Sequence, residues 1–183
     1  MSEQSIEFKG RTITLLVGDI TEQDAEAIVN AANHTLLGGG GVDGAIHRAA
    51  GPQLIEACKE IKKKELIEHR GLLPTGQAVI TDGYRLPAKY VIHTVGPICG
   101  KDQHPEQLLR NAYLNSLQLA DDNRIQSIAF PSISTGAYGC PIRWAAIIAM
   151  TAIKDFLHHA TFVKHVRIVL FKRADYEVYE KVQ

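Results

Sequence analysis

The sequence predicts an α/β domain in which helices cover both faces of a central sheet. Short runs rich in β-branched residues alternate with longer stretches of helical periodicity, and these runs are almost continuously apolar, as in strands buried on both faces. The chain has 183 residues, of which 45% are hydrophobic and 22% charged. This length and composition suit one domain with its own core, so we expect a single domain over 1–183.

Six segments fit strands because β-forming residues dominate them and Gly, Pro or polar residues bound them. In chain order they are 12–18 (TITLLVG), 26–32 (EAIVNAA), 77–81 (QAVIT), 90–96 (YVIHTVG), 127–132 (SIAFPS) and 166–171 (VRIVLF). Four segments with helical periodicity are expected helices: 43–64, with a break near Gly51-Pro52, 105–122, 142–159 and 174–182.

The composition narrows the class of protein. The 20 Lys and Arg balance the 20 Asp and Glu, so no global field attracts nucleic acid or an anionic membrane. The best apolar stretch, 144–150, is too short to span a bilayer, and residues 1–10 have no apolar signal core. Cys58, Cys99 and Cys140 form no C-x-x-C pair, which argues against a disulfide framework and a cysteine-built zinc site. We expect a cytoplasmic protein with no membrane or nucleic-acid partner.

Two loops carry features of phosphate binding. NHTLLGGGGVD at 33–43 leaves an apolar strand and enters a helix; its glycines allow close approach of the backbone, and the helix start offers unpaired N–H groups to an anion. PSISTGAYG at 131–139 also joins a strand to a helix, with Ser, Thr and Gly at its turn. Because a covered sheet usually holds its ligand at such strand ends, we expect the two loops to hold a diphosphate from both sides.

Two common nucleotide motifs do not fit this pattern. The stretch 39–44, GGGVDG, matches G-x-G-x-x-G, but the loop before it is too long, and no clear strand with a ribose-binding acid follows the helix. No Lys-Ser or Lys-Thr pair follows the glycines, as the P-loop of nucleotide triphosphatases requires. The residues alone therefore indicate a phosphate-bearing ligand without naming it.

A set of motifs along nearly the whole chain resembles the macrodomain family, specifically its MacroD-type branch. The motifs are GDI at 18–20, NAAN at 30–33, LLGGGGVDGAIHRAAGP at 36–52, HTVGP at 93–97 and PSISTGAYG at 131–139. The resemblance implies a three-layer α/β/α macrodomain with a central mixed, mostly parallel sheet, and it implies ADP-ribose as the ligand. It implies neither metal nor cofactor, since the glycine-rich stretch lacks the cysteine that the zinc-dependent variety needs.

The resemblance assigns the binding residues. Asp19 is similar to the family acid that accepts a hydrogen bond from the adenine amino group, with the Ile20 backbone at the ring edge, and Phe171 lies where the family often stacks an aromatic on adenine. From the residues alone, Asp19 also fits a helix cap and Phe171 a core side chain. Backbone donors for the diphosphate are expected from Gly39, Gly40, Gly41, Val42, Ser134, Thr135, Gly136, Ala137 and Tyr138.

The distal ribose is expected near two side chains, Asn33 and Tyr138. Asn33 resembles the asparagine that fixes the ribose hydroxyls, and its alternative is a turn asparagine. Tyr138 offers a flat wall against this ribose. Asn30 is expected to be structural, tying the loop to the sheet.

The residue at position 43 distinguishes the prediction of a hydrolase from that of a binding module. In family members that hydrolyse acyl-linked ADP-ribose, an aspartate follows the glycines close to the anomeric carbon, whereas several binding-only relatives have a small or apolar residue there. Asp43 and Asn33 are therefore the predicted catalytic residues. A carboxylate at a helix start is stabilised in its charged form and is a weak base, so we expect Asp43 to orient a water, with the substrate diphosphate as another possible proton acceptor. The alternative for Asp43 is a helix cap alone.

The predicted function is hydrolysis of esters at the distal ribose, either of O-acetyl-ADP-ribose or of ADP-ribose carried on protein Asp or Glu side chains. The alternative is a non-catalytic ADP-ribose-binding module. The expected partners are ADP-ribose, its O-acyl derivatives and mono-ADP-ribosylated proteins, and the expected form is a monomer. His47 is predicted to pack or to support the site, His93 to be a core histidine, and Cys140 not to be a nucleophile.

Overall fold

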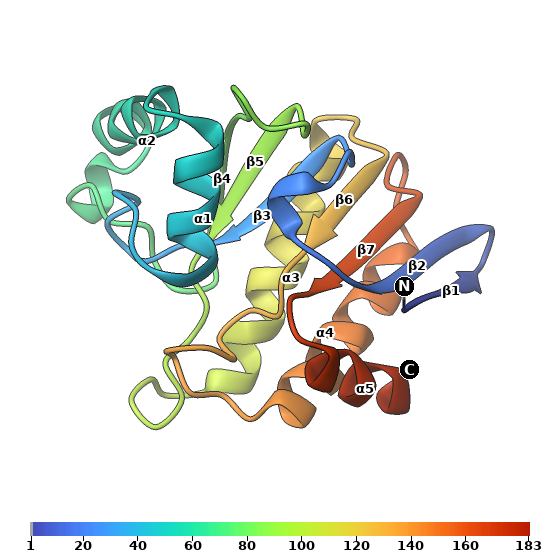
Figure 1. The fold of residues 1–183 in the computed structure, drawn as a ribbon. Coiled ribbons are helices and arrows are strands. Elements are labelled where there is room, and N and C mark those ends of the chain that lie inside the picture. Colours follow the sequence, from blue (N-terminus) through green and yellow to red (C-terminus); the bar gives the residue numbers. More distant parts are fainter. Residues whose placement is uncertain (1) are drawn as a thin grey trace.

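The computed structural model describes residues 2–183, which form a seven-stranded sheet with helices on both faces (Figure 1). The strands are β1 (Glu3–Phe8), β2 (Arg11–Val17), β3 (Ala27–Ala31), β4 (Ala78–Asp82), β5 (Tyr90–Thr94), β6 (Ser127–Phe130) and β7 (His165–Leu170). The helices are α1 (Gly41–Ala50), α2 (Gln53–Lys64), α3 (Pro105–Asp122), α4 (Ile142–Leu157) and α5 (Arg173–Val182), with short 3-10 turns η1 (Ile20–Glu22) and η2 (Ile67–His69).

The sheet is mixed and mostly parallel, which confirms the predicted fold class. Its order is β1-β2-β7-β6-β3-β5-β4, and the five strands from β2 to β5 in this order are parallel to their neighbours. The edge strands β1 and β4 pair antiparallel. The five parallel strands therefore end at one common edge of the sheet.

Successive side chains of the central strands enter two different apolar clusters. In β3, Ala27 and Val29 pack with α3, α4 and α5, while Ile28 between them packs with α1 on the opposite face. In β5, Val91 and Ile92 divide between the clusters in the same way. Because both faces are covered, every position of such a strand gains from being apolar, which explains the continuous apolar runs.

All six predicted strands and all four predicted helical segments are confirmed within a few residues. The segment 43–64 is divided as expected, because Gly51 ends α1 with a positive φ of 85° and α2 starts two residues later. Strand β1 was missed: its side chains alternate between exposed and half-buried, and a turn at Lys9-Gly10, both with positive φ, joins it to β2. Among residues 2–183, no helix is both long and apolar enough to cross a membrane.

Candidate active site

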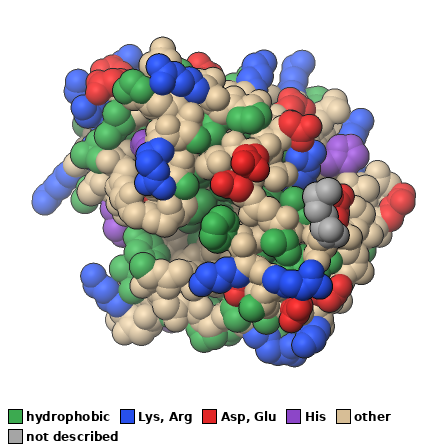
Figure 2. Space-filling model, viewed as in Figure 1, with side chains coloured by type: hydrophobic (Ala, Val, Ile, Leu, Met, Phe, Trp, Pro, Cys, Tyr) green, Lys and Arg blue, Asp and Glu red, His purple; other side chains and the backbone are tan. Residues whose placement is uncertain are grey.

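The segments that carry the predicted site residues follow adjacent parallel strands. Asp19 lies just after β2, Phe171 after β7, the loop 131–139 after β6, and the loop 32–40 after β3. Since the sheet order is β2-β7-β6-β3, these segments follow one another along the carboxyl edge. Figure 2 shows a hollow in this face between the start of α1 and the loop that follows β6. The fold thus brings the predicted residues into one continuous rim.

Asp19 and Phe171 follow the paired ends of β2 and β7, because these two strands are in register. Val17 pairs with Leu170, and the Gly18 N–H donates to the Leu170 carbonyl at 3.0 Å. The Phe171 side chain is 79% exposed, so its alternative as a core residue is wrong. Asp19 Oδ1 caps η1 by accepting from the Thr21 N–H at 2.9 Å and the Thr21 hydroxyl at 2.7 Å. The helix-cap interpretation of Asp19 therefore holds for one oxygen, and no side chain of residues 2–183 donates to the other.

The loop 32–40, which we call the glycine-rich loop, packs tightly against the start of α1. A Cβ atom on Gly44 would lie 2.4 Å from the Gly39 carbonyl oxygen, a clash with backbone, so only glycine lets the loop approach this closely. The first hydrogen bond at this end of α1 runs from the Gly44 N–H to the Gly40 carbonyl. The N–H groups of Gly41, Val42 and Asp43 precede this bond, and they form the positive end of the helix.

Asp43 is buried at the start of α1, and a side chain of the sheet holds it. Its side chain is 7% exposed, and Oδ1 accepts a hydrogen bond of 2.8 Å from Nδ2 of the fully buried Asn30. His47 Nε2 lies 3.4 Å from the same oxygen, so His47 packs beside Asp43, one of the two roles predicted for it. Gly40 is the N-cap of α1, and no side chain makes a capping hydrogen bond. The interpretation of Asp43 as a helix cap alone is therefore wrong.

The structure brings the two predicted catalytic residues together. A Cβ atom on Gly39 would lie 3.2 Å from Asp43 Oδ2 and 3.4 Å from Asn33 Nδ2, so both groups border the same point of the loop. Asn33 Nδ2 donates to the Gly38 carbonyl at 3.0 Å, while Oδ1 accepts from the Thr35 N–H and hydroxyl. Asn33 is thus a turn asparagine, and this turn fixes its amide beside Asp43.

The polar contacts continue from Asn30 into the sheet. Asn30 Nδ2 lies 3.2 Å from Nδ1 of the buried His93, and His93 Nε2 lies 2.9 Å from Thr81 Oγ1. Burial, assisted by the nearby His47, lowers the pKa of His93 to about 4. A neutral ring that accepts at Nδ1 and donates from Nε2 satisfies both contacts. His93 is therefore the satisfied core histidine that was predicted.

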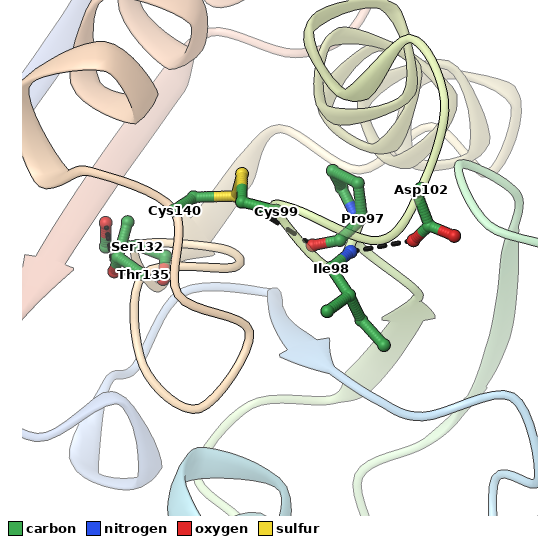
Figure 3. The surroundings of a disulfide bond; sticks show 7 residues. All are labelled: Pro97, Ile98, Cys99, Asp102, Ser132, Thr135 and Cys140. Carbon is green, nitrogen blue, oxygen red and sulfur yellow. Dashed lines mark hydrogen bonds between the residues drawn. A yellow bond between two sulfur atoms is a disulfide. The ribbon is translucent and has the colours of Figure 1, made fainter.

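A disulfide between Cys99 and Cys140 braces the loop 131–139, which we call the second loop (Figure 3). The Cys140 N–H donates to the Ser134 carbonyl and the Cys99 N–H to the Tyr138 carbonyl, both at 2.9 Å. The expectation that the cysteines form no disulfide is therefore wrong for this pair, because the loops after β5 and β6 meet although 41 positions separate the residues. With its sulfur bonded, Cys140 has no thiol to act as a nucleophile, as predicted. Cys58 is free and buried.

The loop 131–139 lies close against the loop that follows β5. A Cβ atom on Gly96 would lie 2.1 Å from Ser134 Oγ, so glycine is required for the loop after β5 to pass under the loop after β6. Burial, followed by the charges of Asp43 and Asp102, raises the pKa of Tyr138.

Sequence reasoning missed the role of Asn30 as the donor to Asp43. The available signal was a polar side chain in an otherwise apolar strand, which needs a hydrogen-bond partner when buried. Among residues 2–183, no group of three or more His, Cys, Asp and Glu side chains is placed to hold a metal ion.

The fold and the rim define the class: an α/β/α domain whose predicted site residues lie along the carboxyl edge of its sheet. A model of the macro domain family matches residues 29–149. A macro domain-containing protein of Caldanaerobacter subterraneus is 53% identical over 170 residues, which cover 92% of this chain and 94% of that protein. The O-acetyl-ADP-ribose deacetylase of Escherichia fergusonii is 49% identical over 171 residues, 93% of this chain and 94% of the relative.

Solved structures agree with these sequence relatives. A mutant of the Oceanobacillus iheyensis macrodomain with ADPR superposes with a TM-score of 0.94 at 46% identity, covering 99% of this chain and 96% of that one. The protein belongs to the macro domain family.

Proposed function

We propose that this protein is a hydrolase that binds ADP-ribose along the carboxyl edge and cleaves esters at the distal ribose. The deacetylase relative is named for O-acetyl-ADP-ribose and matches this chain over nearly its full length, and the Oceanobacillus iheyensis structure holds ADPR. The observation that carries the proposal is the buried Asp43 carboxylate, which is held by Asn30 and borders Asn33 beside the glycine-rich loop.

Each part of the rim suits one part of ADP-ribose. The exposed Phe171 ring offers a stacking surface for adenine, and the second oxygen of Asp19 is able to accept from the adenine amino group. The N–H groups of Gly39–Val42 and of the loop 134–138 are candidate donors to the diphosphate, with the positive end of α1 behind them. The distal ribose then lies between the Asn33 amide and the Tyr138 ring.

Asp43 has one oxygen engaged and one available. Oδ1 accepts from Asn30, whereas Oδ2 faces Gly39 near the Asn33 amide. A water held between Oδ2 and a diphosphate oxygen is positioned to attack the ester that joins the acyl group to the distal ribose. The products are the free acid and ADP-ribose. The water's proton passes to Asp43 or to the diphosphate, and the ribose oxygen leaves as a hydroxyl.

The test compares wild type with Asp43→Asn, which keeps the side-chain shape. We expect the substitution to slow release of ADP-ribose roughly 100- to 10,000-fold, the range that general acid–base groups contribute, with ADP-ribose binding retained by calorimetry. The assay uses O-acetyl-ADP-ribose and a protein mono-ADP-ribosylated on Asp or Glu. Asp82→Asn is the matched control, because Asp82 is exposed at the end of the antiparallel edge strand β4.

Wild-type protein that binds ADP-ribose but releases none from either substrate would reduce the function to binding alone. Equal turnover by wild type and Asp43→Asn would remove Asp43 from the mechanism.

A further inference from the structure

A second hollow, of about 370 Å³, lies beside the glycine-rich loop, between α1, the start of α2 and the loop that joins β4 to β5. Its lining includes Leu37, Gly38, His47, Arg48, Ile55 and Arg85. We refer to it as the Arg48–Arg85 hollow. No step of the proposed hydrolysis uses the two arginines.

The two arginines leave the hollow with uncompensated positive charge. Both side chains are exposed, and neither forms an ion pair or a side-chain hydrogen bond with any of residues 2–183. Guanidinium groups prefer carboxylates, which they bind through two parallel hydrogen bonds. The hollow therefore favours an acidic occupant.

Both arginine side chains lie close to the backbone of a glycine. A Cβ atom on Gly51 would lie 3.1–3.3 Å from Cδ, Nε and Cζ of Arg85, so this side chain lies directly on the Gly51 backbone. The Arg85 N–H also donates to the Ala50 carbonyl at 3.2 Å, which fixes its loop to the end of α1. A Cβ atom on Gly44 would lie 3.0 Å from Nη1 of Arg48. Both guanidinium groups therefore lie against α1 or the residue that ends it.

The hollow adjoins the candidate active site through one side chain. The His47 ring lines the hollow, and its Nε2 lies 3.4 Å from Asp43 Oδ1. Gly38 lines the hollow as well, and its carbonyl accepts from the Asn33 amide. An acyl group attached to the distal ribose beside Asp43 and Asn33 is therefore a short distance from this hollow, whereas the adenine end of the rim lies across the sheet at β2 and β7.

We propose that the Arg48–Arg85 hollow binds acidic residues that flank the modified Asp or Glu of a mono-ADP-ribosylated protein. Carboxylates of the protein would pair with the two guanidinium groups, and the apolar side chains of Leu37 and Ile55 would contact the aliphatic part of the peptide. The proposal rests on the proposed hydrolase function and specifies its protein substrate. The acetyl group carries no carboxylate to pair with the arginines, so O-acetyl-ADP-ribose serves as an internal reference.

The experiment compares wild type with Arg48→Gln, Arg85→Gln and the double variant on three substrates. These are a peptide mono-ADP-ribosylated on Glu with flanking Asp and Glu residues, the same peptide with Asn and Gln in the flanks, and O-acetyl-ADP-ribose. Arg124→Gln is the matched control, because Arg124 is an exposed arginine just before β6, at the opposite edge of the sheet.

We expect the double variant to raise KM for the acidic peptide roughly three- to tenfold at low salt, with kcat unchanged, as for exposed charge pairs. The difference should shrink as the salt concentration rises, and the other two substrates should be unaffected. Equal KM values for wild type and the double variant on the acidic peptide would overturn the proposal. An equal loss on all three substrates would also overturn it, since the arginines would then act on ADP-ribose or on the fold.

A binding measurement separates this proposal from the hydrolase function. Fluorescence anisotropy with the intact acidic peptide, in the Asp43→Asn background, compares affinities with and without the two arginine substitutions. If wild type cleaves no substrate, the hydrolase proposal fails, and this comparison still decides whether the hollow binds acidic flanks. A weakened affinity supports the hollow as a binding site, and an unchanged affinity rejects it.

Discussion

The buried amide of Asn30 donates a hydrogen bond of 2.8 Å to Asp43 Oδ1. Asn30 lies in β3, in the middle of the sheet, whereas Asp43 lies in the first turn of α1. The sheet therefore supplies the hydrogen bond that holds the candidate catalytic carboxylate, although the helix α1 carries it. This contact links the rigid core of the fold directly to the proposed chemistry.

Removal of this contact should impair turnover more than binding. Asn30→Ala leaves Asp43 Oδ1 without its donor, and the carboxylate is then free to rotate away from the water, which we expect to lower kcat roughly 100-fold. The ADP-ribose dissociation constant should change little, because the rim that contacts the ligand is left in place. Steady-state kinetics with O-acetyl-ADP-ribose and calorimetry with ADP-ribose measure the two effects. Unaltered kcat would show that Asp43 does not need this donor.

Phe171 should contribute to affinity without contributing to stability. Its ring is 79% exposed, so Phe171→Ala removes little buried surface and should leave the melting temperature unchanged. Loss of a base–aromatic stack costs about 1–3 kcal/mol, which corresponds to a roughly 5- to 150-fold weaker affinity for ADP-ribose. Calorimetry tests this, with ribose 5-phosphate as the control ligand because it has no adenine. The same loss for both ligands would argue against stacking.

Reduction of the Cys99–Cys140 disulfide should destabilise the fold. The bond joins residues 41 positions apart, and in the chain-entropy view a crosslink of this span lowers the free energy of the folded state relative to the unfolded one by about 4 kcal/mol. Urea unfolding with and without a thiol reductant measures the difference. The double variant Cys99→Ser/Cys140→Ser should have the stability of the reduced wild type, and the reductant should not change that stability. A variant that still responds would point to the remaining thiol, Cys58.

His93 should make the stability fall in acid. Burial depresses its pKa to about 4 in the folded protein, from the ordinary value of 6.5. Above pH 6.5 the ring is neutral in both the folded and the unfolded protein, so its titration does not change the free energy of unfolding. As the pH falls from 6.5 to 4, the unfolded chain gains the proton first, and the free energy of unfolding drops by up to about 3 kcal/mol.

The comparison that isolates this effect is urea unfolding of wild type and His93→Gln between pH 4 and 8. The variant should be less stable at neutral pH, because it disturbs the contacts to Asn30 and Thr81, but its stability should depend less on pH over this window. Parallel curves for the two proteins would assign the acid sensitivity to other groups.

The sequence predicts the fold well where burial dictates it. The central strands are apolar at every position because α1 covers one face and α3, α4 and α5 the other, and that pattern can be read without coordinates. Strand β1 has no such signal, since an edge strand with one half-buried face tolerates the polar residues of EQSIEF. Glycine runs and strand ends likewise predicted the positions of both loops.

The contacts within the site are less accessible to sequence reasoning. The Cys99–Cys140 disulfide depends on the meeting of two loops that are distant in sequence, and no local pattern encodes such a meeting. The Asn30–Asp43 hydrogen bond likewise depends on how α1 sits on β3. For Asp19, the turn uses one carboxylate oxygen and leaves the other for the proposed contact with adenine, whereas both ends of the Asn33 amide are engaged in its turn.

The bracing of the second loop has a kinetic consequence. The hydrogen bonds of Ser134 and Tyr138 and the disulfide behind them hold the loop in shape from within the chain, so a ligand has little ordering to impose on it. If this loop holds the diphosphate as proposed, association requires no slow closing step of this loop, and differences in affinity among related ligands are expected mainly in their residence times. The proposed site would then follow rapid changes in ligand concentration without delay.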